Sequence, residues 1–308
     1  MKTVIITGAT GFIGMAVSQK LLETGCIVYG VGRNETKLHK LDSYPNYIPI
    51  LIDSSTPFFV EKIPSKSIDV LFHFAWDGGY MQNALKDDSL QISNIQMSCD
   101  VIKQAVELGV KKFIYAGTVN EVEIHQSLNE YDNFQMRPTC IYAASKLAAE
   151  LICKTIAQEH HMQFCSGLIP MLYGPGNLSK QVVNVVIESL LCHETPKLIK
   201  GDNLYDIVHI DDVASAFAAI AEKGKDGKAY YIGHRELKTF RAWMEEIRNC
   251  VSPDGKLGFG EYQDPLNLDY SLLDLNALYR DTGFECTRNF EENLQRFITW
   301  IQSEKGET

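Results

Sequence analysis

The sequence predicts an α/β fold with a doubly wound parallel sheet, followed by a smaller C-terminal α/β region. Three observations lead to this prediction: an apolar, β-branched run at Val4–Ile6, a glycine-rich turn directly after it, and an apolar helical pattern after the turn. Strand and helix patterns then alternate along the first half of the chain, which indicates parallel strands joined by right-handed crossovers. We therefore expect a Rossmann-type sheet.

The glycine-rich turn contains Gly8, Gly11 and Gly14, between the first strand and the first helix. Glycines at such a turn let the backbone approach a pyrophosphate, whose charge the helix N-terminus stabilises. The alternative is a turn that serves packing only, but the flanking strand and helix favour dinucleotide binding. The residues expected to contact the coenzyme here are Gly8, Thr10, Gly11, Phe12, Ile13 and Gly14.

The end of the second strand, at residues 27–32, should reach the adenosine ribose of the coenzyme. An acidic residue there would accept from the 2′-hydroxyl of NAD, but Gly32 and Arg33 occupy the position. A guanidinium without a carboxylate suits a 2′-phosphate, so NADP is the favoured cofactor and NAD the alternative. In the other interpretation, Arg33 stacks on adenine or lies in solvent.

Three more strand patterns follow in the first half, at residues 47–52, 68–74 and 112–116, and a helical pattern at 87–108 precedes the last of them. Ligands bind at the carboxyl ends of parallel strands, so the residues that follow two of these strands are candidates for coenzyme contacts. Asp53 is placed to accept from the adenine amino group. The candidates are Asp53, Ser54, Phe74, Ala75 and Trp76.

The regular alternation ends near residue 165. A turn-rich passage at 169–176 follows, then helical patterns at 180–192, 213–222, 238–251 and 289–304, with short strands at 197–200 and 206–210. We expect residues 1–165 to form a nucleotide-binding domain. Residues 166–308 are expected to form a smaller substrate-binding region over the carboxyl ends of the strands, in part interleaved with the first domain.

The composition is that of a globular protein in a reducing compartment. The net charge of −10 over 308 residues disfavours nucleic acids and anionic membranes as partners. No apolar run approaches the roughly 20 residues of a membrane helix, and the N-terminal glycines argue against a signal peptide. The eight cysteines include no C-x-x-C pair, which favours free thiols in the cytoplasm and disfavours a metal site.

Three residues are candidates for catalysis. Thr118 follows the fifth strand, and Tyr142 and Lys146 lie four residues apart at the start of a helical pattern, on one helix face. The nearby ammonium stabilises a phenolate and lowers the tyrosine pKa from its ordinary value of about 10, toward acid–base use near neutrality. The alternative is a solvated pair on a surface helix, but the position after a nucleotide-binding half favours catalysis.

Several motifs together resemble the extended short-chain dehydrogenase/reductases. They are T-G-A-T-G-F-I-G at 7–14, A-G-T at 116–118, Y-A-A-S-K at 142–146, Y-G-P-G at 173–176 and H-I-D-D-V-A at 209–214. Within this group, the sequence is most similar to the NAD-dependent epimerase/dehydratase family, which acts on nucleotide sugars. The resemblance spans nearly the whole chain and is specific to the family, not to one substrate.

The resemblance implies a role for each residue that matches a family motif. Tyr142 would be the acid or base that moves the proton of a sugar hydroxyl. Lys146 would bind the nicotinamide ribose and tune Tyr142, while Thr118 would bind the reacting oxygen. Asn94 matches a helix asparagine that shapes the active site, and Pro170 is a further expected coenzyme contact.

The sequence departs from the family at functional positions. Dehydratases of the family carry an Asp-Glu pair directly after the threonine, where this chain has Val119 and Asn120, so dehydration is disfavoured. Glu121 remains as an extra carboxylate, and Tyr205 replaces an arginine that contacts the nucleotide diphosphate in relatives. The expected substrate contacts are Thr118, Asn120, Glu121, Met171, Asn177 and Tyr205.

The sequence therefore indicates a cytoplasmic NAD(P)-dependent epimerase or 4-ketoreductase that acts on a nucleotide-linked hexose or deoxyhexose. A dissociating NADPH suits net reduction, whereas epimerases usually retain NAD. The alternatives are a ketoreductase of a non-sugar substrate and a non-catalytic relative that senses the dinucleotide. The resemblance also implies a homodimer through the helices at 87–108 and 140–160; in the other interpretation, their apolar residues pack inside the monomer.

Overall fold

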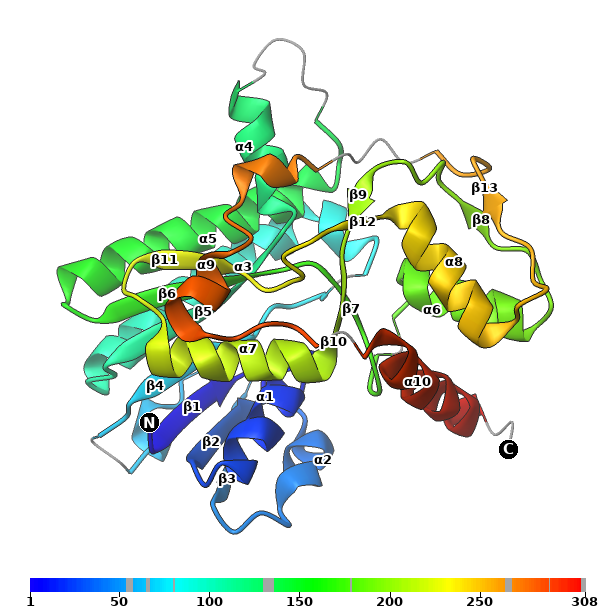
Figure 1. Cartoon of the computed structure of the whole chain (residues 1–308). Helices are drawn as coiled ribbons and strands as arrows, with labels where there is room; N and C mark the ends of the chain where they lie inside the picture. The colour runs from blue at the N-terminus through cyan, green and yellow to red at the C-terminus, as the bar shows by residue number, and fades with distance from the viewer. Residues whose placement is uncertain are drawn as a thin grey trace.

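The computed structural model describes residues 1–53, 58–64, 67–79, 81–129, 136–177, 179–263, 268–287 and 289–305. Within these residues, seven parallel strands form the main sheet, in the order β11-β6-β5-β4-β1-β2-β3 (Figure 1). The strands are β1 (Thr3–Thr7), β2 (Ile27–Gly32), β3 (Tyr47–Leu51), β4 (Val70–His73), β5 (Lys112–Thr118), β6 (Gln163–Ile169) and β11 (Lys228–Tyr231). The predicted Rossmann-type sheet is confirmed.

The strand order reverses beside β1, because the chain adds β2 and β3 on one side and β4 and β5 on the other. Side chains of β1 alternate between the two faces of the sheet: Val4 and Ile6 enter one buried cluster and Ile5 the other. Both faces are therefore covered, as a parallel sheet requires. The reversal leaves a crevice at the carboxyl ends of the strands, where such sheets bind ligands.

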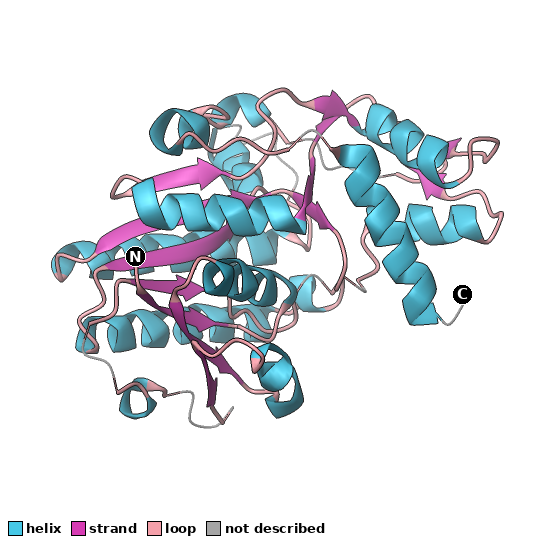
Figure 2. Cartoon of the chain, turned by 60° about the horizontal axis from the view of Figure 1, so that its bottom comes forward, coloured by secondary structure: helices cyan, strands magenta, loops and turns pink. Residues whose placement is uncertain are grey.

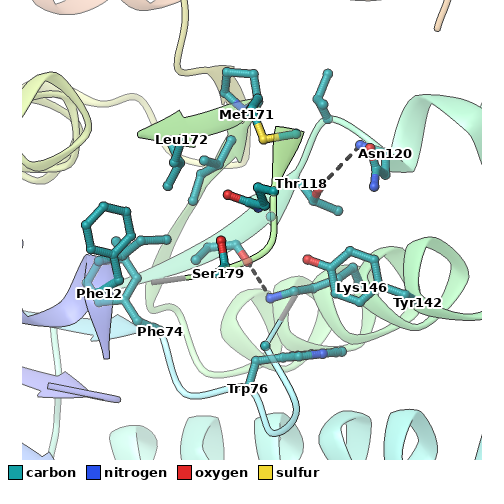
Figure 3. A pocket seen from close by; sticks show the side chains of 18 of the residues that line it. Phe12, Phe74, Trp76, Thr118, Asn120, Tyr142, Lys146, Met171, Leu172 and Ser179 are labelled. Atoms are coloured by element: carbon teal, nitrogen blue, oxygen red, sulfur yellow. Dashed lines mark hydrogen bonds between the residues drawn. The ribbon is translucent and has the colours of Figure 1, made fainter. Parts of the chain in front are cut away.

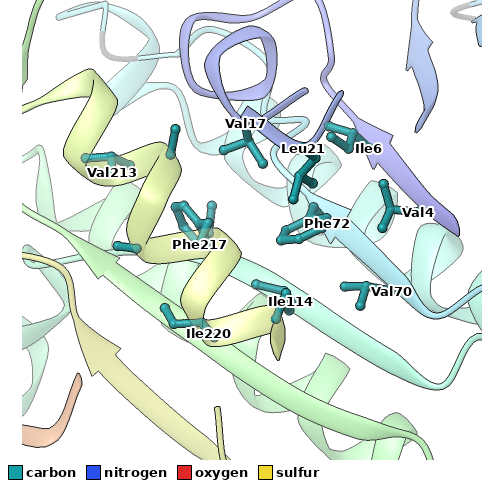
Figure 4. Close-up of a cluster of buried hydrophobic side chains, with 14 of the residues drawn as sticks. Val4, Ile6, Val17, Leu21, Val70, Phe72, Ile114, Val213, Phe217 and Ile220 are labelled. Atoms are coloured by element: carbon teal, nitrogen blue, oxygen red, sulfur yellow. The ribbon is translucent and has the colours of Figure 1, made fainter. Parts of the chain in front are cut away.

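Helices cover the two faces as separate layers (Figures 1 and 2). Helices α1 (Phe12–Glu23), α7 (Ile210–Lys223) and α9 (Ala277–Thr282) pack on one face, and α3 (Asp88–Glu107) and α5 (Cys140–Glu159) pack on the other. Figure 4 shows Phe217 of α7 beside Phe72 and Ile114 of the sheet. Full burial of one such apolar side chain stabilises the fold by about 1.5–3 kcal/mol.

The alternation of strands and helices continues beyond the point that the sequence indicates. The predicted boundary at residue 165 falls inside β6, and the chain returns through α7 to β11, which pairs with β6 at the sheet edge. The sequence analysis missed both strands of the sheet. β11 has only four residues, too few for a period-2 pattern to distinguish it from a loop.

A smaller C-terminal lobe packs around its own core, which includes Ile187, Trp243 and Phe297. Its helices are α6 (Val182–Leu191), α8 (Phe240–Val251) and α10 (Phe290–Lys305). Three short strand pairs accompany them: β7 (Met171–Tyr173) with β10 (Ile207–His209), β9 (Leu204–Tyr205) with β12 (Lys238–Thr239), and β8 (Lys197–Leu198) with β13 (Gly258–Phe259). Two further helices are α2 (Glu35–Leu38) and α4 (Glu121–Asn129). None of the helices described here is long and apolar enough to cross a membrane.

Candidate active site

Two cavities meet over the carboxyl ends of the central strands. The first, here called the tyrosine cavity, contains Tyr142 and Lys146 of α5 and the residues that follow β5 and β6. The second, the arginine cavity, contains Arg33 and lies between the ends of β2 and β4. The residues that line both cavities are Gly8, Gly11, Phe74 and Trp76.

The glycine turn brings α1 close to the end of β1 and leaves no room for a side chain at Gly8 or at Gly14. A Cβ on Gly8 would lie 2.6 Å from the backbone nitrogen of Ala75, and a Cβ on Gly14 would collide with the carbonyl oxygen of Gly8. Gly8 also has a φ of +71°, which glycine adopts at little cost. Gly11 caps α1 without a side-chain hydrogen bond, so the first amides of the helix are left for an anion. The turn therefore fits a pyrophosphate.

Arg33 lies at the rim of the arginine cavity and pairs with Asp77, from the loop after β4. Its Nη1 donates to Oδ2 of Asp77 at 2.9 Å, and its Nη2 donates to Oδ1. The two side chains are 47% and 34% exposed. Asn94 of α3 holds the same loop, because its Oδ1 accepts from the Asp77 amide at 2.8 Å and its Nδ2 donates to the Asp77 carbonyl at 3.0 Å. Arg33 thus has a carboxylate partner that the sequence analysis did not predict.

Lys146 extends from α5 into the tyrosine cavity and is 6% exposed. Its Nζ donates to the carbonyl oxygen of Ala116 at 2.9 Å and lies 4.0 Å from the ring centre of Trp76 (Figure 3). Burial lowers the pKa of Lys146 to about 8, although the carboxyl groups of Glu121 and Glu150 oppose this effect. The ammonium therefore lies close to its titration range at neutral pH.

Tyr142 lies one helical turn before Lys146 and is 8% exposed. Its ring meets Trp76 edge to face, with the ring centres 6.2 Å apart. Thr118 ends β5, and its Oγ1 accepts from the amide of Asn120 at 3.4 Å (Figure 3). Tyr142, Lys146 and Thr118 all line the same cavity. Such a set can bind a carbonyl or hydroxyl oxygen and exchange a proton with it.

The C-terminal part of the chain forms one side of the tyrosine cavity, here called the outer wall, with Met171, Asn177, Tyr205 and Asp206. Apart from Asp206, these residues are neutral. The side chain of Asn177 is buried; its Oδ1 accepts from the Ser179 amide at 3.0 Å, and its Nδ2 donates to the Leu172 carbonyl at 3.2 Å. Among the described residues that line this cavity, one is a lysine or arginine, Lys146, and one is an aspartate or glutamate, Asp206.

Most of the predicted site residues line one of the two cavities. The tyrosine cavity is lined by Gly8, Gly11, Phe12, Ile13, Gly14, Phe74, Trp76, Thr118, Asn120, Tyr142, Lys146, Pro170, Met171, Asn177 and Tyr205, and the arginine cavity adds Thr10, Arg33, Ala75 and Asn94. Asp53 is exposed and lines neither cavity. The preceding residue, Ile52, lines the arginine cavity instead. Ser54 lies outside the described residues. Glu121 is buried behind the cavity wall.

Sequence reasoning missed three acidic residues at the site. Asp77 follows β4 and pairs with Arg33. Glu150 lies on the buried side of α5, four residues after Lys146, and this spacing was a signal that could have identified it. Asp206 accepts from the Tyr231 hydroxyl at 2.6 Å and from the His234 amide at 2.8 Å.

Comparison with known families accounts for this arrangement. The NAD dependent epimerase/dehydratase family matches residues 4–233. The chain belongs to this family. Its members are NAD-dependent enzymes of the extended short-chain dehydrogenase/reductase type, so the class of enzyme predicted from the sequence is confirmed.

Two curated relatives align along almost the whole chain. The dTDP-D-glucose 4,6-dehydratase of Bos taurus is 27% identical over 318 residues, which cover 98% of this chain and 89% of the relative. The trifunctional UDP-glucose 4,6-dehydratase/UDP-4-keto-6-deoxy-D-glucose 3,5-epimerase/UDP-4-keto-L-rhamnose-reductase of Arabidopsis thaliana is 23% identical over 97% of this chain. The chain spans about half of that plant protein, 47% of its length.

Two solved structures share the fold. The dTDP-glucose 4,6-dehydratase of Streptomyces venezuelae, solved with NAD, has a TM-score of 0.80 at 21% identity, and the match covers 99% of this chain and 98% of the other. The UDP-glucose 4-epimerase of Thermotoga maritima, solved with UDP-glucose, has a TM-score of 0.75 at 21% identity, with 98% and 99% covered.

We expect a Gly11→Val variant to fold like the parent and to lose dinucleotide binding. Gly11 has an ordinary φ of −83°, and the nearest atom to its Cβ position is the Gly8 carbonyl oxygen at 3.2 Å. The valine methyl groups would fill the space that a phosphate needs. Calorimetric titration with NADP and NAD measures affinity, and thermal unfolding verifies the fold. Parental affinity in this variant would place the pyrophosphate elsewhere.

Proposed function

We propose that the chain is an NAD(P)-dependent epimerase or 4-ketoreductase that acts on a nucleotide-linked hexose or deoxyhexose. The observation that carries the proposal is the buried Tyr142–Lys146 pair, which shares one cavity with Thr118 beside the glycine turn. The family and its relatives support it, since they include nucleotide-sugar dehydratases, an epimerase and a protein with a reductase activity.

In this proposal, Tyr142 exchanges a proton with the substrate oxygen. It acts as a general acid when a ketone is reduced and as a general base when an alcohol is oxidised. Lys146 lowers the pKa of the phenol through its charge, and the hydroxyl of Thr118 donates to the same substrate oxygen. When bound, the coenzyme supplies or accepts the hydride at the adjacent sugar carbon.

The two cavities fit a dinucleotide coenzyme. The free amides at the start of α1, beside Gly11, would hold the pyrophosphate. Lys146 would bind the nicotinamide ribose in the tyrosine cavity, and the adenosine would occupy the arginine cavity near Arg33 and Asn94. The dinucleotide would therefore cross the glycine turn, which separates the two cavities.

Water elimination is not part of the proposal, although several relatives are dehydratases. Val119 is apolar and buried, and Asn120 is neutral, so neither can act as a general acid or base. Glu121 lies behind the wall and does not line the cavity. The described residues therefore favour hydride transfer with one proton carrier.

We expect Tyr142→Phe to lower turnover by about 10²- to 10⁴-fold, the usual contribution of a general acid or base. The ring and its contact with Trp76 remain, so folding and coenzyme binding should survive. Lys146→Ala should weaken coenzyme binding and move the pH profile upward, because the phenol loses its cation. Thr118→Ala should cost less than Tyr142→Phe. Steady-state rates across pH measure all three; a Tyr142→Phe rate within a few-fold of the parent would exclude Tyr142 as the proton carrier.

We further propose that NADP binds more tightly than NAD, with Arg33 contacting the 2′-phosphate. Gly32 offers no carboxylate to a ribose hydroxyl, which supports this choice. The Asp77 carboxylate opposes NADP binding, because its two oxygens already accept from Nη1 and Nη2 of Arg33. The phosphate would have to displace Asp77 or share Arg33 with it.

Asp77→Asn is therefore expected to raise NADP affinity by roughly tenfold, the scale of one charge-assisted hydrogen bond, and to leave NAD affinity unchanged. The backbone contacts between residue 77 and Asn94 should keep the loop in place. Arg33→Ala should weaken NADP alone. Fluorescence titration with NADPH and NADH measures both variants. A parent that prefers NAD, or an Arg33→Ala variant with parental NADP affinity, contradicts the proposal.

A ketoreductase of a neutral, non-sugar substrate is the second candidate, and the outer wall favours it. A nucleotide diphosphate is an anion, but the one cation among the described residues that line the cavity is Lys146, which lies on α5 and not on the outer wall. Tyr205, on the outer wall, stands where relatives have an arginine. Mass spectrometry of the denatured protein identifies any carried-over dinucleotide, and a thermal-shift screen of substrates in its presence separates the two candidates. Stabilisation by nucleotide sugars supports the first candidate; stabilisation by neutral ketones alone supports the second.

We also propose a cytoplasmic homodimer built from α3 and α5, which pack against each other. Ile92 of α3 is 63% exposed, and Leu151 and Ile152 of α5 are 55% and 41% exposed. Ile102, an apolar residue of the same helix α3, is buried against the sheet. Large exposed apolar side chains on two neighbouring helices support an association surface.

We expect a dimer mass by light scattering at micromolar concentration and a monomer after Leu151→Lys with Ile152→Lys. The two ammonium groups would be buried without partners if a second copy covered this face. Ile27→Lys is the matched control, because Ile27 is also 41% exposed but begins β2 and belongs to neither helix. A parent that is monomeric at this concentration contradicts the proposal.

A further inference from the structure

Two buried glutamates lie behind the tyrosine cavity and have no part in the chemistry proposed above. Glu121 begins α4 and is 3% exposed; Glu150 of α5 is 7% exposed. Glu150 follows Lys146 by four residues and Tyr142 by eight, so the three side chains share one face of α5. A carboxyl group is almost never buried without a partner. These two therefore require an explanation.

The two carboxyl groups converge on the backbone of Gly117, the residue before Thr118. A Cβ added to Gly117 would lie 2.9 Å from Oε1 of Glu121 and 3.3 Å from Oε2 of Glu150. Glycine at this position leaves the space in which the two groups meet, and any larger residue would push them apart.

The hydrogen bonds of the pair leave one oxygen atom unexplained. Oε1 of Glu121 accepts from the amide of Thr118 at 2.8 Å, and Oε1 of Glu150 accepts from the hydroxyl of Ser166 at 2.7 Å. Oε2 of Glu150 is buried, and no donor reaches it among the described residues. The adjacent carboxyl of Glu121 supplies a donor when it carries a proton.

The charges around the pair favour one proton between the two groups. The titratable or charged side chains that face it are Tyr115 from β5, with Lys146, Cys153 and Lys154 from α5. On α4, Glu123 pairs with Arg137 instead, and Nζ of Lys154 donates to the Gly227 carbonyl at 2.6 Å. Two buried carboxylates beside one buried ammonium would leave a charge without compensation. Burial also raises the pKa of both Glu121 and Glu150.

We propose that Glu121 and Glu150 share a single proton and present one negative charge, which keeps Lys146 an ammonium beside Tyr142 and fixes the backbone of Thr118. The inference rests on the proposed function for the roles of Tyr142, Lys146 and Thr118. Both glutamates are positioning residues, because neither lines the cavity. They act on the proton carrier through Lys146 and on the substrate oxygen through Thr118.

Infrared spectroscopy of protein labelled in its glutamate carboxyl groups tests the shared proton at neutral pH. The parent should show the carbonyl band of a buried protonated carboxyl. Glu121→Gln and Glu150→Gln should each abolish it, because the remaining carboxylate accepts from the new amide and the single charge persists. Glu159→Gln, an exposed site on the same helix, should retain the band. A parent without the band, or single variants that keep half of it, overturns the proposal.

The pH dependence of NADPH affinity tests the effect on Lys146. The parent and both single variants should lose affinity over the same alkaline range. The Glu121→Gln/Glu150→Gln double variant should lose it about 1 pH unit lower, since a neighbouring opposite charge no longer favours the ammonium. A double variant with the parental profile contradicts the proposal. The infrared measurement on the parent does not depend on enzymatic activity. A protein that shows the band but has no activity would therefore contradict the proposed function and leave the shared proton supported.

Discussion

The close approach of α1 to the end of β1 is the constraint on which the rest of the site depends. The Gly8 carbonyl oxygen leaves no space for a side chain at Gly14, so glycine at this position allows α1 to lie close to the end of β1. Its apolar face, with Val17 and Leu21, then packs with Phe217 of α7 over the same strands. The helix α7 follows β10 directly. The position of α1 therefore also determines where the C-terminal lobe meets the strand ends and encloses the tyrosine cavity.

A second constraint is electrostatic and concerns Lys146. A buried ammonium is costly unless hydrogen bonds and nearby charge compensate for lost water. The carbonyl oxygen of Ala116 and the ring of Trp76 each supply part of this compensation. They are neutral, however, and burial still lowers the pKa of Lys146 to about 8. The single negative charge that we propose for Glu121 and Glu150 opposes the effect of burial and favours the protonated form of Lys146.

Local patterns made the sheet, the glycine turn and the Tyr142–Lys146 spacing predictable, since each depends on neighbours within a few residues. Some of the features that were missed, such as the partner of Arg33, depend on distant parts of the chain. Arg33 and Asp77 lie 44 residues apart, and nothing near Arg33 in the sequence announces a carboxylate partner. Glu121 was expected to contact substrate because it follows Thr118 closely. The start of α4 turns it inward instead, where its carboxyl binds the Thr118 amide.

Charge is distributed differently at the two ends of the site. The turn at Gly8–Gly14 offers backbone amides to a pyrophosphate, so a chain with a net charge of −10 can bind a dinucleotide there without a cluster of cations. At the outer wall, the Asp206 carboxylate is bound by Tyr231 and His234. Burial lowers the pKa of His234, but the hydrogen bond to Asp206 together with the negative charges of Asp206 and Asp212 raises the pKa above its ordinary value. When His234 is protonated, it offsets the charge of Asp206. In the proposed function, the outer wall would therefore select its substrate through shape and neutral hydrogen bonds, and charge would act mainly beside Lys146.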